Sequence, residues 1–146
     1  DSFVRILEDF LGFSRVDGAF LVGAGSLGSA LLQDKGLSAF GLQIEAAFDT
    51  DKTKIGTKVN DIEIFHIDQF RAMAAERKVV IGIITVPAEH AQNVADLMVA
   101  WGIKAIWNFT PARIKVPTHI VVQNTTIYMN LAILFNKLYN DKGEKK

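Results

Sequence analysis

The chain contains no cysteine, which excludes disulfides, thiolate metal sites and a cysteine nucleophile. It also has no net charge, because 16 basic side chains balance 16 acidic ones. Nucleic-acid binding depends on clustered Lys and Arg, so this balance argues against the chain gripping nucleic acid by itself. The longest apolar stretch, residues 79–87, is far shorter than the roughly 20 residues that span a bilayer. We expect a cytoplasmic protein that is not bound to a membrane.

Length and composition predict one folded domain. The chain has 146 residues, of which 49% are hydrophobic and 22% are charged, and such a composition folds rather than staying disordered. A domain of about 150 residues buries roughly 68–70% of its unfolded surface, which allows a sizeable core. The first residue is Asp1 and no signal peptide is visible, so we expect a fragment or a processed product.

The predicted elements alternate between strands and helices. Strands are expected at residues 19–22, 44–48, 63–66, 79–86, 104–107 and 119–122. Helices are expected at residues 3–11, 26–37, 67–76, 88–101 and 126–139. This alternation indicates a parallel sheet with helices on both faces, and near-continuous apolar strands are typical of a doubly covered sheet. The fold class is therefore α/β, with a Rossmann-like doubly wound parallel sheet.

A glycine motif of the form G-x-G-x-x-G lies between the first predicted strand and the helix after it. Its first glycine allows a tight turn, its second lets the backbone approach a pyrophosphate, and its third lets the helix pack close to the strand. The pyrophosphate would lie on the helix N-terminus, where free N–H groups favour an anion. The alternative is a glycine-rich turn without a ligand. The predicted cofactor-binding residues here are Gly23, Ala24, Gly25, Ser26, Leu27 and Gly28.

An acidic residue follows the motif at the spacing that ribose binding requires. Asp49 stands 21 residues after Gly28, at the end of the second predicted strand. A carboxylate there accepts hydrogen bonds from the adenosine ribose and repels a 2′-phosphate, which favours NAD over NADP. Asp51 is the nearby competitor, and the charges of Lys52 and Lys54 slightly weaken this preference. The alternative is a solvated turn aspartate.

Two further loops follow neighbouring strands of the predicted sheet. Ligands of doubly wound sheets bind beyond the carboxyl ends of the strands, so topology places both loops beside the ligand. Ordinary strand termination is the alternative for each. The predicted cofactor-binding residues of these loops are Thr85, Val86 and Pro87 in the first, and Asn108, Phe109 and Thr110 in the second.

The sequence lacks a recognisable set of catalytic residues. The three histidines, His66, His90 and His119, are widely spaced and join no carboxylate in a metal or nucleophile motif. His90 is nearest the expected cleft, but a solvated or capping histidine is commoner there than a general base. We therefore expect no metal site and no catalysis. A nucleotide pocket without acid–base groups indicates sensing, or an enzyme whose substrate half lies elsewhere.

Several blocks together resemble the family of redox-sensing transcriptional repressors called Rex. They are VGAGSLGSALL at 22–32, AFDTD at 47–51, GIITVPAE at 82–89 and GIKAIWNFTP at 102–111, and the likeness continues through 116–117 and 122–124. In that family a Rossmann domain binds NADH or NAD⁺, and a separate N-terminal winged-helix domain binds operator DNA. NADH releases the repressor from DNA, and the last helix swaps between the subunits of a homodimer.

The resemblance implies a division of the chain and a function. Residues 1–12 would be a helix leading from an absent winged-helix domain, 13–124 the NAD(H)-binding domain, 125–140 the dimerisation helix, and 141–146 a tail. Ile127 would approach the partner's nicotinamide. The chain would be the NAD(H)-sensing part of a homodimeric repressor, and would reach operator DNA through the missing domain alone.

The last predicted helix has two adjoining apolar stripes. They consist of Ile127, Leu131, Leu134 and Leu138, and of Tyr128, Ala132, Phe135 and Tyr139. This apolar surface is wider than one sheet-facing side of a helix needs, which favours docking against a second copy. The alternative is burial in the cleft of its own subunit.

One departure from the Rex pattern and two other functions stay open. The family commonly has an acidic residue where this chain has Thr126, and that acid is associated with dimer contacts that link the cofactor to the DNA-binding domains. The substitution therefore puts redox coupling in question more than nucleotide binding. The chain also resembles the CoA-binding domain of acyl-CoA synthetases, although Asp49 opposes the phosphorylated ribose of CoA. A truncated dehydrogenase is the third possibility.

Overall fold

A computed structural model describes Arg5 and residues 18–33 and 42–125. The helix expected at 3–11 is therefore described at Arg5 alone, which is helical. The predicted dimerisation helix, with Thr126 and Ile127, and the tail at 141–146 lie outside the described residues. No helix in the described part of the chain is long and apolar enough to cross a membrane.

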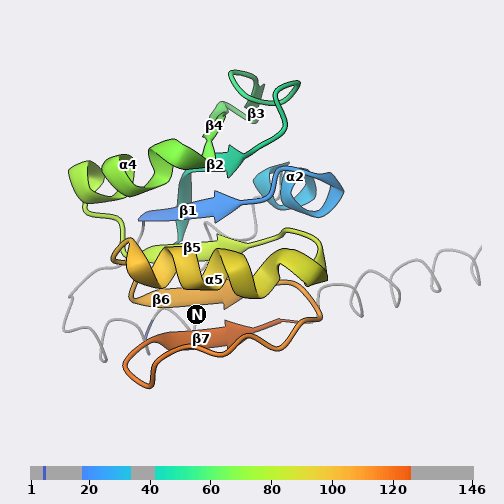
Figure 1. Ribbon diagram of the computed structural model, residues 1–146. Helices are drawn as coiled ribbons and strands as arrows, with labels where there is room; N and C mark the ends of the chain where they lie inside the picture. The colour runs from blue at the N-terminus through green and yellow to red at the C-terminus, as the bar shows by residue number, and fades with distance from the viewer. Residues whose placement is uncertain (1–4, 6–17, 34–41, 126–146) are drawn as a thin grey trace, which may run out of the picture.

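The described strands form one seven-stranded sheet in the order β3-β4-β2-β1-β5-β6-β7 (Figure 1). Every neighbouring pair is parallel except β3 and β4, which form an antiparallel hairpin. The chain builds outward from β1 in one direction and then returns to build from β5 in the other, which is the doubly wound order predicted from the sequence. The strands are β1 Gly18–Val22, β2 Gln43–Asp49, β3 Lys58–Val59, β4 Ile62–His66, β5 Ile81–Ile84, β6 Ala105–Asn108 and β7 Val121–Asn124.

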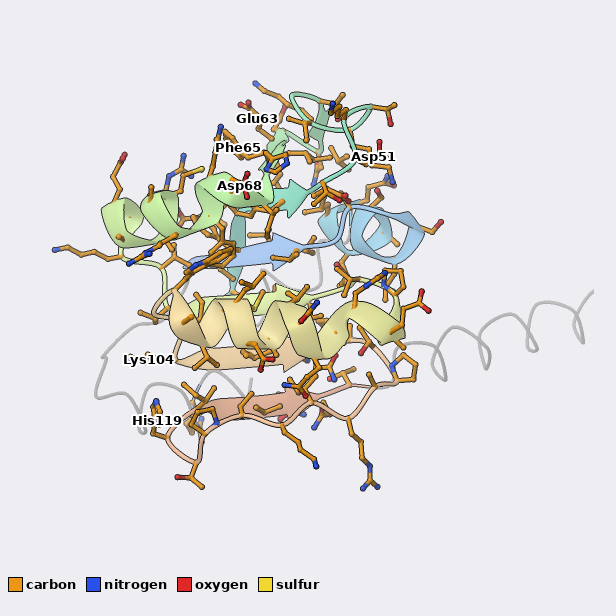
Figure 2. All side chains as sticks on the ribbon, viewed as in Figure 1. Asp51, Glu63, Phe65, Asp68, Lys104 and His119 are labelled. Carbon is orange, nitrogen blue, oxygen red and sulfur yellow. The ribbon has the colours of Figure 1, made fainter. Side chains whose placement is uncertain are left out.

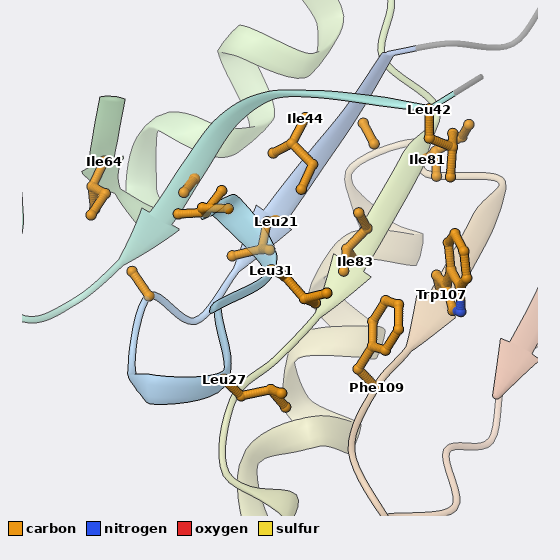
Figure 3. Close-up of a cluster of buried hydrophobic side chains, with 14 of the residues drawn as sticks. Leu21, Leu27, Leu31, Leu42, Ile44, Ile64, Ile81, Ile83, Trp107 and Phe109 are labelled. Carbon is orange, nitrogen blue, oxygen red and sulfur yellow. The ribbon is translucent and has the colours of Figure 1, made fainter. Parts of the chain in front are cut away.

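Helices cover both faces of this sheet. They are α2 Ser26–Gln33, α4 Phe70–Arg77 and α5 Ala91–Ala100, with the short 3-10 turns η1 Ile67–Gln69 and η2 Ala88–His90 before α4 and α5. On one face, Leu27 and Leu31 of α2 belong to the same buried cluster as Leu21 and Ile83 (Figure 3). On the other face, α4 and α5 contribute to a second cluster.

The second cluster is built around three phenylalanine rings. Phe20 of β1 lies with its ring centroid 5.0 Å from Phe48 of β2 and 5.3 Å from Phe70 of α4, and all three residues are fully buried. Tilted and edge-to-face rings at such distances attract each other beyond the gain from buried area. Because Phe20 and Leu21 are adjacent, the alternation along a strand sends one to each face and so joins β1 to both cores.

The structure differs from the predicted elements mainly at their ends. The strand expected at 79–86 is shorter, because Val79 N–H still donates to Ala74 O at 2.9 Å and closes α4. The strand expected at 119–122 starts two residues later, because the Ile120 N–H bonds back to Pro117 O at 3.0 Å in a turn. The helix expected at 26–37 is described as far as Gln33.

The β3–β4 hairpin was not predicted. Its turn uses Asn60 and Asp61 at φ 53° and 66°, the left-handed region in which Asn and Asp are enriched. The Asn60 side chain also donates to Leu32 O at 3.2 Å, which fixes the hairpin on α2. The strands flanking this turn are too short to give a clear alternating pattern, so the sequence signal was weak.

Candidate functional site

A cleft of about 610 Å³ opens at the carboxyl edge of the sheet, where the strand order reverses. Val22 pairs with Phe48 on one side and with Ile84 on the other, so β1, β2 and β5 end at the same level and their loops start side by side. The lining comes from these loops, from the ends of β1 and β2, and from α2, η1, η2 and α5. It consists of Val22, Gly23, Gly25, Ser26, Leu27, Asp49, Thr50, Asp51, Lys54, Ile67, Thr85, Val86, Pro87, His90, Asn93, Val94 and Leu97.

The three motif glycines have different steric surroundings. Gly23 adopts φ 107°, and a Cβ there would lie 2.7 Å from Val86 N. At Gly28 a Cβ would overlap the carbonyl oxygen of Gly23, so the helix could not pack as close to the turn. A Cβ on Gly25 would meet nothing within 4 Å, because this glycine faces the open cleft. The tight turn and close packing predicted for Gly23 and Gly28 are therefore present.

The N-terminus of α2 supplies hydrogen-bond donors to the cleft. The first N–H groups of a helix have no partner inside the helix, and here that turn begins at Ser26. Gly25, Ser26 and Leu27 all line the cleft. Free N–H groups and the helix dipole favour an anion at such a position, and a phosphate group has the chemistry to use them.

Asp49 is held rigidly beside the glycine loop. Its Oδ2 accepts from Ala24 N–H at 2.8 Å, and its Oδ1 accepts from the N–H groups of Thr50 and Asp51 at 2.7 and 3.0 Å. A carboxylate oxygen can accept two hydrogen bonds, so Oδ2 keeps capacity for a ligand hydroxyl. The predicted ribose-binding residue therefore lines the cleft and also fixes the loop that forms it.

Lys54 binds the carbonyl group of Ala24, the same residue whose N–H group binds Asp49. Its Nζ donates to Ala24 O at 2.8 Å, and its side chain lines the cleft. Ala24 itself is 1% exposed and uses both backbone groups in these contacts, so it does not line the cleft although its neighbours do. Lys54 was not predicted to line the cleft, because a lysine in a polar turn is usually solvated.

Asp51 is exposed and negatively charged. Its Oδ1 accepts from both Thr53 Oγ1, at 2.7 Å, and Thr53 N–H, at 3.0 Å. These bonds, the side-chain one first, lower the pKa of Asp51 below its usual value, and the Lys54 charge adds a smaller effect in the same direction. Figure 2 shows Asp51 on the loop after β2. The cleft edge thus holds a carboxylate that stays ionised at neutral pH.

The loop after β5 is hydrogen-bonded to the start of the glycine loop through Thr85. Thr85 is 5% exposed, and its Oγ1 lies 3.0 Å from Val22 O and 2.7 Å from Gly23 O, within donor reach of both carbonyls. Thr85 therefore lines the cleft while fixing the turn at Gly23. Val86 and Pro87 continue the lining, and Pro87 is the N-cap residue of η2.

The loop after β6 does not contribute to the cleft lining. Asn108, Phe109 and Thr110 are 0%, 3% and 4% exposed. Asn108 Oδ1 accepts from the N–H and Oγ1 of Thr110, and its Nδ2 donates to Ala112 O and to Asn124 Oδ1. Phe109 stacks on Trp107 at a centroid distance of 4.9 Å (Figure 3). That these three residues bind a cofactor stays a prediction.

Most of the helical part of the cleft wall was not predicted from the sequence, although His90 was expected nearest the cleft. The residues concerned are His90, Asn93, Val94 and Leu97, which belong to α5 and the turn before it. Their spacing of three or four residues puts their side chains on one face of the helix. Leu97 is 40% exposed. The cue was available, because this helix follows Pro87 directly. Thr50 and Ile67 carried no comparable signal.

The histidines do not form a catalytic group. His90 lies in the wall, largely exposed, with its Nε2 3.9 Å from Glu89 Oε1. His66 Nδ1 accepts from the Asp68 N–H at 3.0 Å, as the cap of η1. His119 lies at the opposite end of the sheet, near Lys104 (Figure 2). Among the described residues, no group of three or more His, Asp or Glu side chains could hold a metal ion.

Comparisons with known proteins match this chain to a domain family and to Rex repressors. Residues 17–112 match the CoA binding domain family. The chain is 57% identical over 138 residues to the redox-sensing transcriptional repressor Rex of Bacteroides fragilis, covering 94% of this chain and 63% of that protein. It is also similar to the crystal structure of RSP, a Rex-family repressor, with a TM-score of 0.75, 30% identity, and coverage of 99% of this chain and 69% of that one. The chain belongs to the Rex family.

Two further Rex structures show what a relative binds. RSP has been solved in complex with β-NADH and in complex with β-NAD⁺ and operator DNA. Each has a TM-score of 0.74 and 30% identity to this chain; they cover 99% of it, and the chain covers 70% and 66% of them respectively. This chain spans less than two thirds of the curated Rex relatives it matches, 63% for that of B. fragilis.

Proposed function

We propose that this chain is the NAD(H)-sensing part of a Rex-type redox-responsive repressor. Cofactor binding in it would control the DNA affinity of a separate winged-helix domain. The observation that carries the proposal is the open space at Gly25 above the N-terminus of α2, with the Asp49 carboxylate fixed beside it. The NADH and NAD⁺ complexes of RSP support it.

Each part of the dinucleotide has a complementary region of the cleft. The pyrophosphate would bind the N–H groups at Gly25, Ser26 and Leu27, and the adenosine ribose would bind Asp49. The nicotinamide half would then extend toward Thr85–Pro87. Ile127, predicted to approach it from a partner subunit, lies outside the described residues.

Calorimetric titration with NADH, NAD⁺, NADPH and CoA tests this assignment. We expect NADH and NAD⁺ to bind more tightly than NADPH, because Asp49 and Asp51 place negative charge at the ribose end. Tighter binding of NADPH or CoA than of either NAD form would contradict the proposal.

A CoA-binding module of an acyl-CoA synthetase-like enzyme is the second candidate. It is favoured by the match of residues 17–112 to the CoA binding domain family. The phosphorylated ribose of CoA would meet Asp49, whose fixed carboxylate opposes it. The CoA arm of the titration separates the two candidates, because this one requires CoA to be the strongest ligand.

We further propose that the chain performs no catalysis. Of the histidines in the sequence, His90 alone lines the cleft, and it is largely exposed. The Glu89 carboxylate lies 3.9 Å from its Nε2, beyond the hydrogen-bond reach that an acid–base pair needs. Reproducible oxidation of bound NADH by small carbonyl compounds, abolished in His90→Ala, would instead favour a truncated dehydrogenase.

We also propose that residues 125–140 form a helical segment that docks on a second copy. The support is the pair of apolar stripes in its sequence together with the Rex family membership. Thr125, the first residue of this segment, is held by its N–H on Asn108 O at 3.0 Å and by its Oγ1, which accepts from Trp107 Nε1 at 2.7 Å. Deleting the residues after Asn124 should convert a dimer into a monomer or an aggregate and weaken NADH binding. A monomeric intact chain in sedimentation at micromolar concentration would contradict this.

A further inference from the structure

Lys54 differs from the lysines near it in the sequence. Lys52 and Lys58 are exposed, whereas Lys54 is half-buried, with its ammonium on Ala24 O. A lysine in an acidic, polar turn ordinarily remains solvated, because a surface contact gains little free energy. Among the residues that the structure describes, Lys54 is also the sole lysine or arginine in the cleft lining.

The turn that carries Lys54 is closely tied together. Lys54 N–H donates to Asp51 O at 3.0 Å, and Lys54 O accepts from the N–H and Oγ1 of Thr57 at 3.1 and 2.6 Å. Gly56 adopts φ 88° and its N–H donates to Ile64 O at 2.8 Å, which anchors the turn on β4. The side chain of Lys54 therefore leaves the backbone at a fixed point beside the cleft.

The contact with Ala24 does not use all the hydrogen-bond donors of the Lys54 ammonium group. An ammonium group has three N–H donors, and one of them serves Ala24 O. Ala24 O also accepts from Ser29 Oγ at 3.1 Å, so this carbonyl keeps a partner when Lys54 turns toward a ligand. Ser29 and Lys54 thus both hold the Ala24 carbonyl, so Lys54 can also donate a hydrogen bond to a ligand.

Asp49 and Lys54 form a matched acceptor and donor. They bind the N–H and the C=O of the same residue, Ala24, and both line the cleft. A ribose hydroxyl both donates and accepts, so a carboxylate and an ammonium that both line the cleft suit a ribose diol. A phosphate in place of one hydroxyl would instead be attracted by Lys54 and repelled by Asp49 and Asp51.

We propose that Lys54 determines dinucleotide specificity together with Asp49, by donating to the adenosine ribose from which Asp49 accepts. This inference rests on the proposed NAD(H)-binding function and deepens it. In this inference the carboxylates of Asp49 and Asp51 repel a 2′-phosphate on the ribose. Lys54 attracts that phosphate, but the two carboxylates outweigh this attraction in the wild-type chain.

The first experiment compares Lys54→Met with Lys52→Met in calorimetric titrations of NADH on the full chain. Both variants remove one positive charge from the same turn, but Lys52 is exposed and does not line the cleft. Losing a charge-assisted hydrogen bond should weaken NADH binding about tenfold in Lys54→Met. We expect Lys52→Met to stay within about twofold, since an exposed charge acts weakly. Equal affinities in the two variants would overturn the inference.

The second experiment separates binding to the ribose from holding the loop. In an Asp49→Asn background, NADPH should gain on NADH by about tenfold, and adding Lys54→Met should remove that gain. A Lys54 that merely holds the loop would instead weaken NADH and NADPH by the same factor, which would overturn the inference. Asp51→Asn, at an exposed position, provides a second background if Asp49→Asn lowers the melting temperature.

Failure of the inference can be told apart from failure of the proposed function. A wild-type chain that binds no NADH and no NAD⁺ would contradict the function itself. A wild-type chain that binds NADH while Lys54→Met binds it equally well would contradict the role of Lys54 alone.

Discussion

The glycine loop and the loop after β6 lie at the same edge of the sheet, yet their polar groups differ in whether they face the cleft or are buried. In the glycine loop, Gly25 faces open space, and the start of α2 directs N–H groups into the cleft. In the loop after β6, Asn108 and Thr110 are buried and bond to each other. The glycine loop keeps backbone N–H groups that a ligand could bind, whereas the loop after β6 uses its polar groups in hydrogen bonds that stabilise the fold.

This difference teaches how far topology can locate a site. The doubly wound order places every loop at the carboxyl edge near the ligand region. Whether a loop can bind then depends on the hydrogen bonds left over once its own buried groups have partners. Four substitutions test this contrast, in order of decreasing expected effect.

Gly28→Ala should have the largest effect. Its Cβ would overlap Gly23 O, so the start of α2 must shift, at a cost of about 3 kcal/mol in unfolding free energy, with loss of NADH binding. The control is Gly25→Ala, whose Cβ meets nothing within 4 Å, so stability should hold while the ligand is obstructed. Urea unfolding and calorimetry measure the two effects. Equal stability losses in both variants would contradict the steric account.

Asn108→Ala should cost about 2 kcal/mol of stability, because it leaves buried partners such as the Thr110 N–H without a bond. We expect the folded variant to keep most of its NADH affinity, since Asn108 does not line the cleft. Thermal unfolding with and without NADH separates the two quantities. Lost affinity at unchanged stability would instead support Asn108 as a cofactor-binding residue.

Asp49→Ala should weaken NADH binding by about 1–3 kcal/mol, the range expected for charge-assisted hydrogen bonds. Asp51→Ala serves as the control, because its exposed carboxylate bonds to Thr53 rather than to the glycine loop. We expect that variant to bind NADH within about 0.5 kcal/mol of wild type. Unchanged affinity in Asp49→Ala would show that Asp49 is a turn residue only.

Thr53→Val should have the smallest effect. It removes the hydroxyl bond that most lowers the pKa of Asp51, so that pKa should rise toward its usual value. A depressed folded pKa contributes stability above the unfolded pKa, and this is lost as pH falls through the folded pKa. The variant should therefore lose less stability in acid than wild type. NMR titration of Asp51 checks the pKa, with Thr50→Val as control; an unchanged pKa would contradict the assigned cause.

Much of the fold was predictable because its signals are local. The apolar, β-branched run at Ile81–Ile84 and the glycine motif indicate a strand and a strand–helix turn without knowledge of the rest of the chain. The β3–β4 hairpin was missed because it depends on Asn60 reaching Leu32, a contact between residues 28 positions apart. The exact strand ends depended on turn hydrogen bonds such as Ile120 to Pro117, which leave little trace in composition.

The site was predictable where a residue type has one reason to be present. Gly23 and Gly28 could be identified because no other residue fits their surroundings. The absence of Asn108 from the cleft lining could not be predicted, because an asparagine at a strand end suits a ligand and an internal network equally well. Lys54 was missed because its contact with Ala24 arises only once the turn at 51–57 has folded against the glycine loop.

Hydrogen exchange with and without NADH tests the central claim most directly, because it reads the two loops in one measurement. The amides at the start of α2 have no partner within the helix and should exchange quickly until a pyrophosphate covers them. The Phe109 and Thr110 N–H groups already bond to Ile84 O and Asn108 Oδ1, each at 3.0 Å, and should change little. We predict that NADH slows exchange at Gly25–Leu27 and leaves 109–110 unaffected. Protection that appears at 109–110 and not at Gly25–Leu27 would contradict the account.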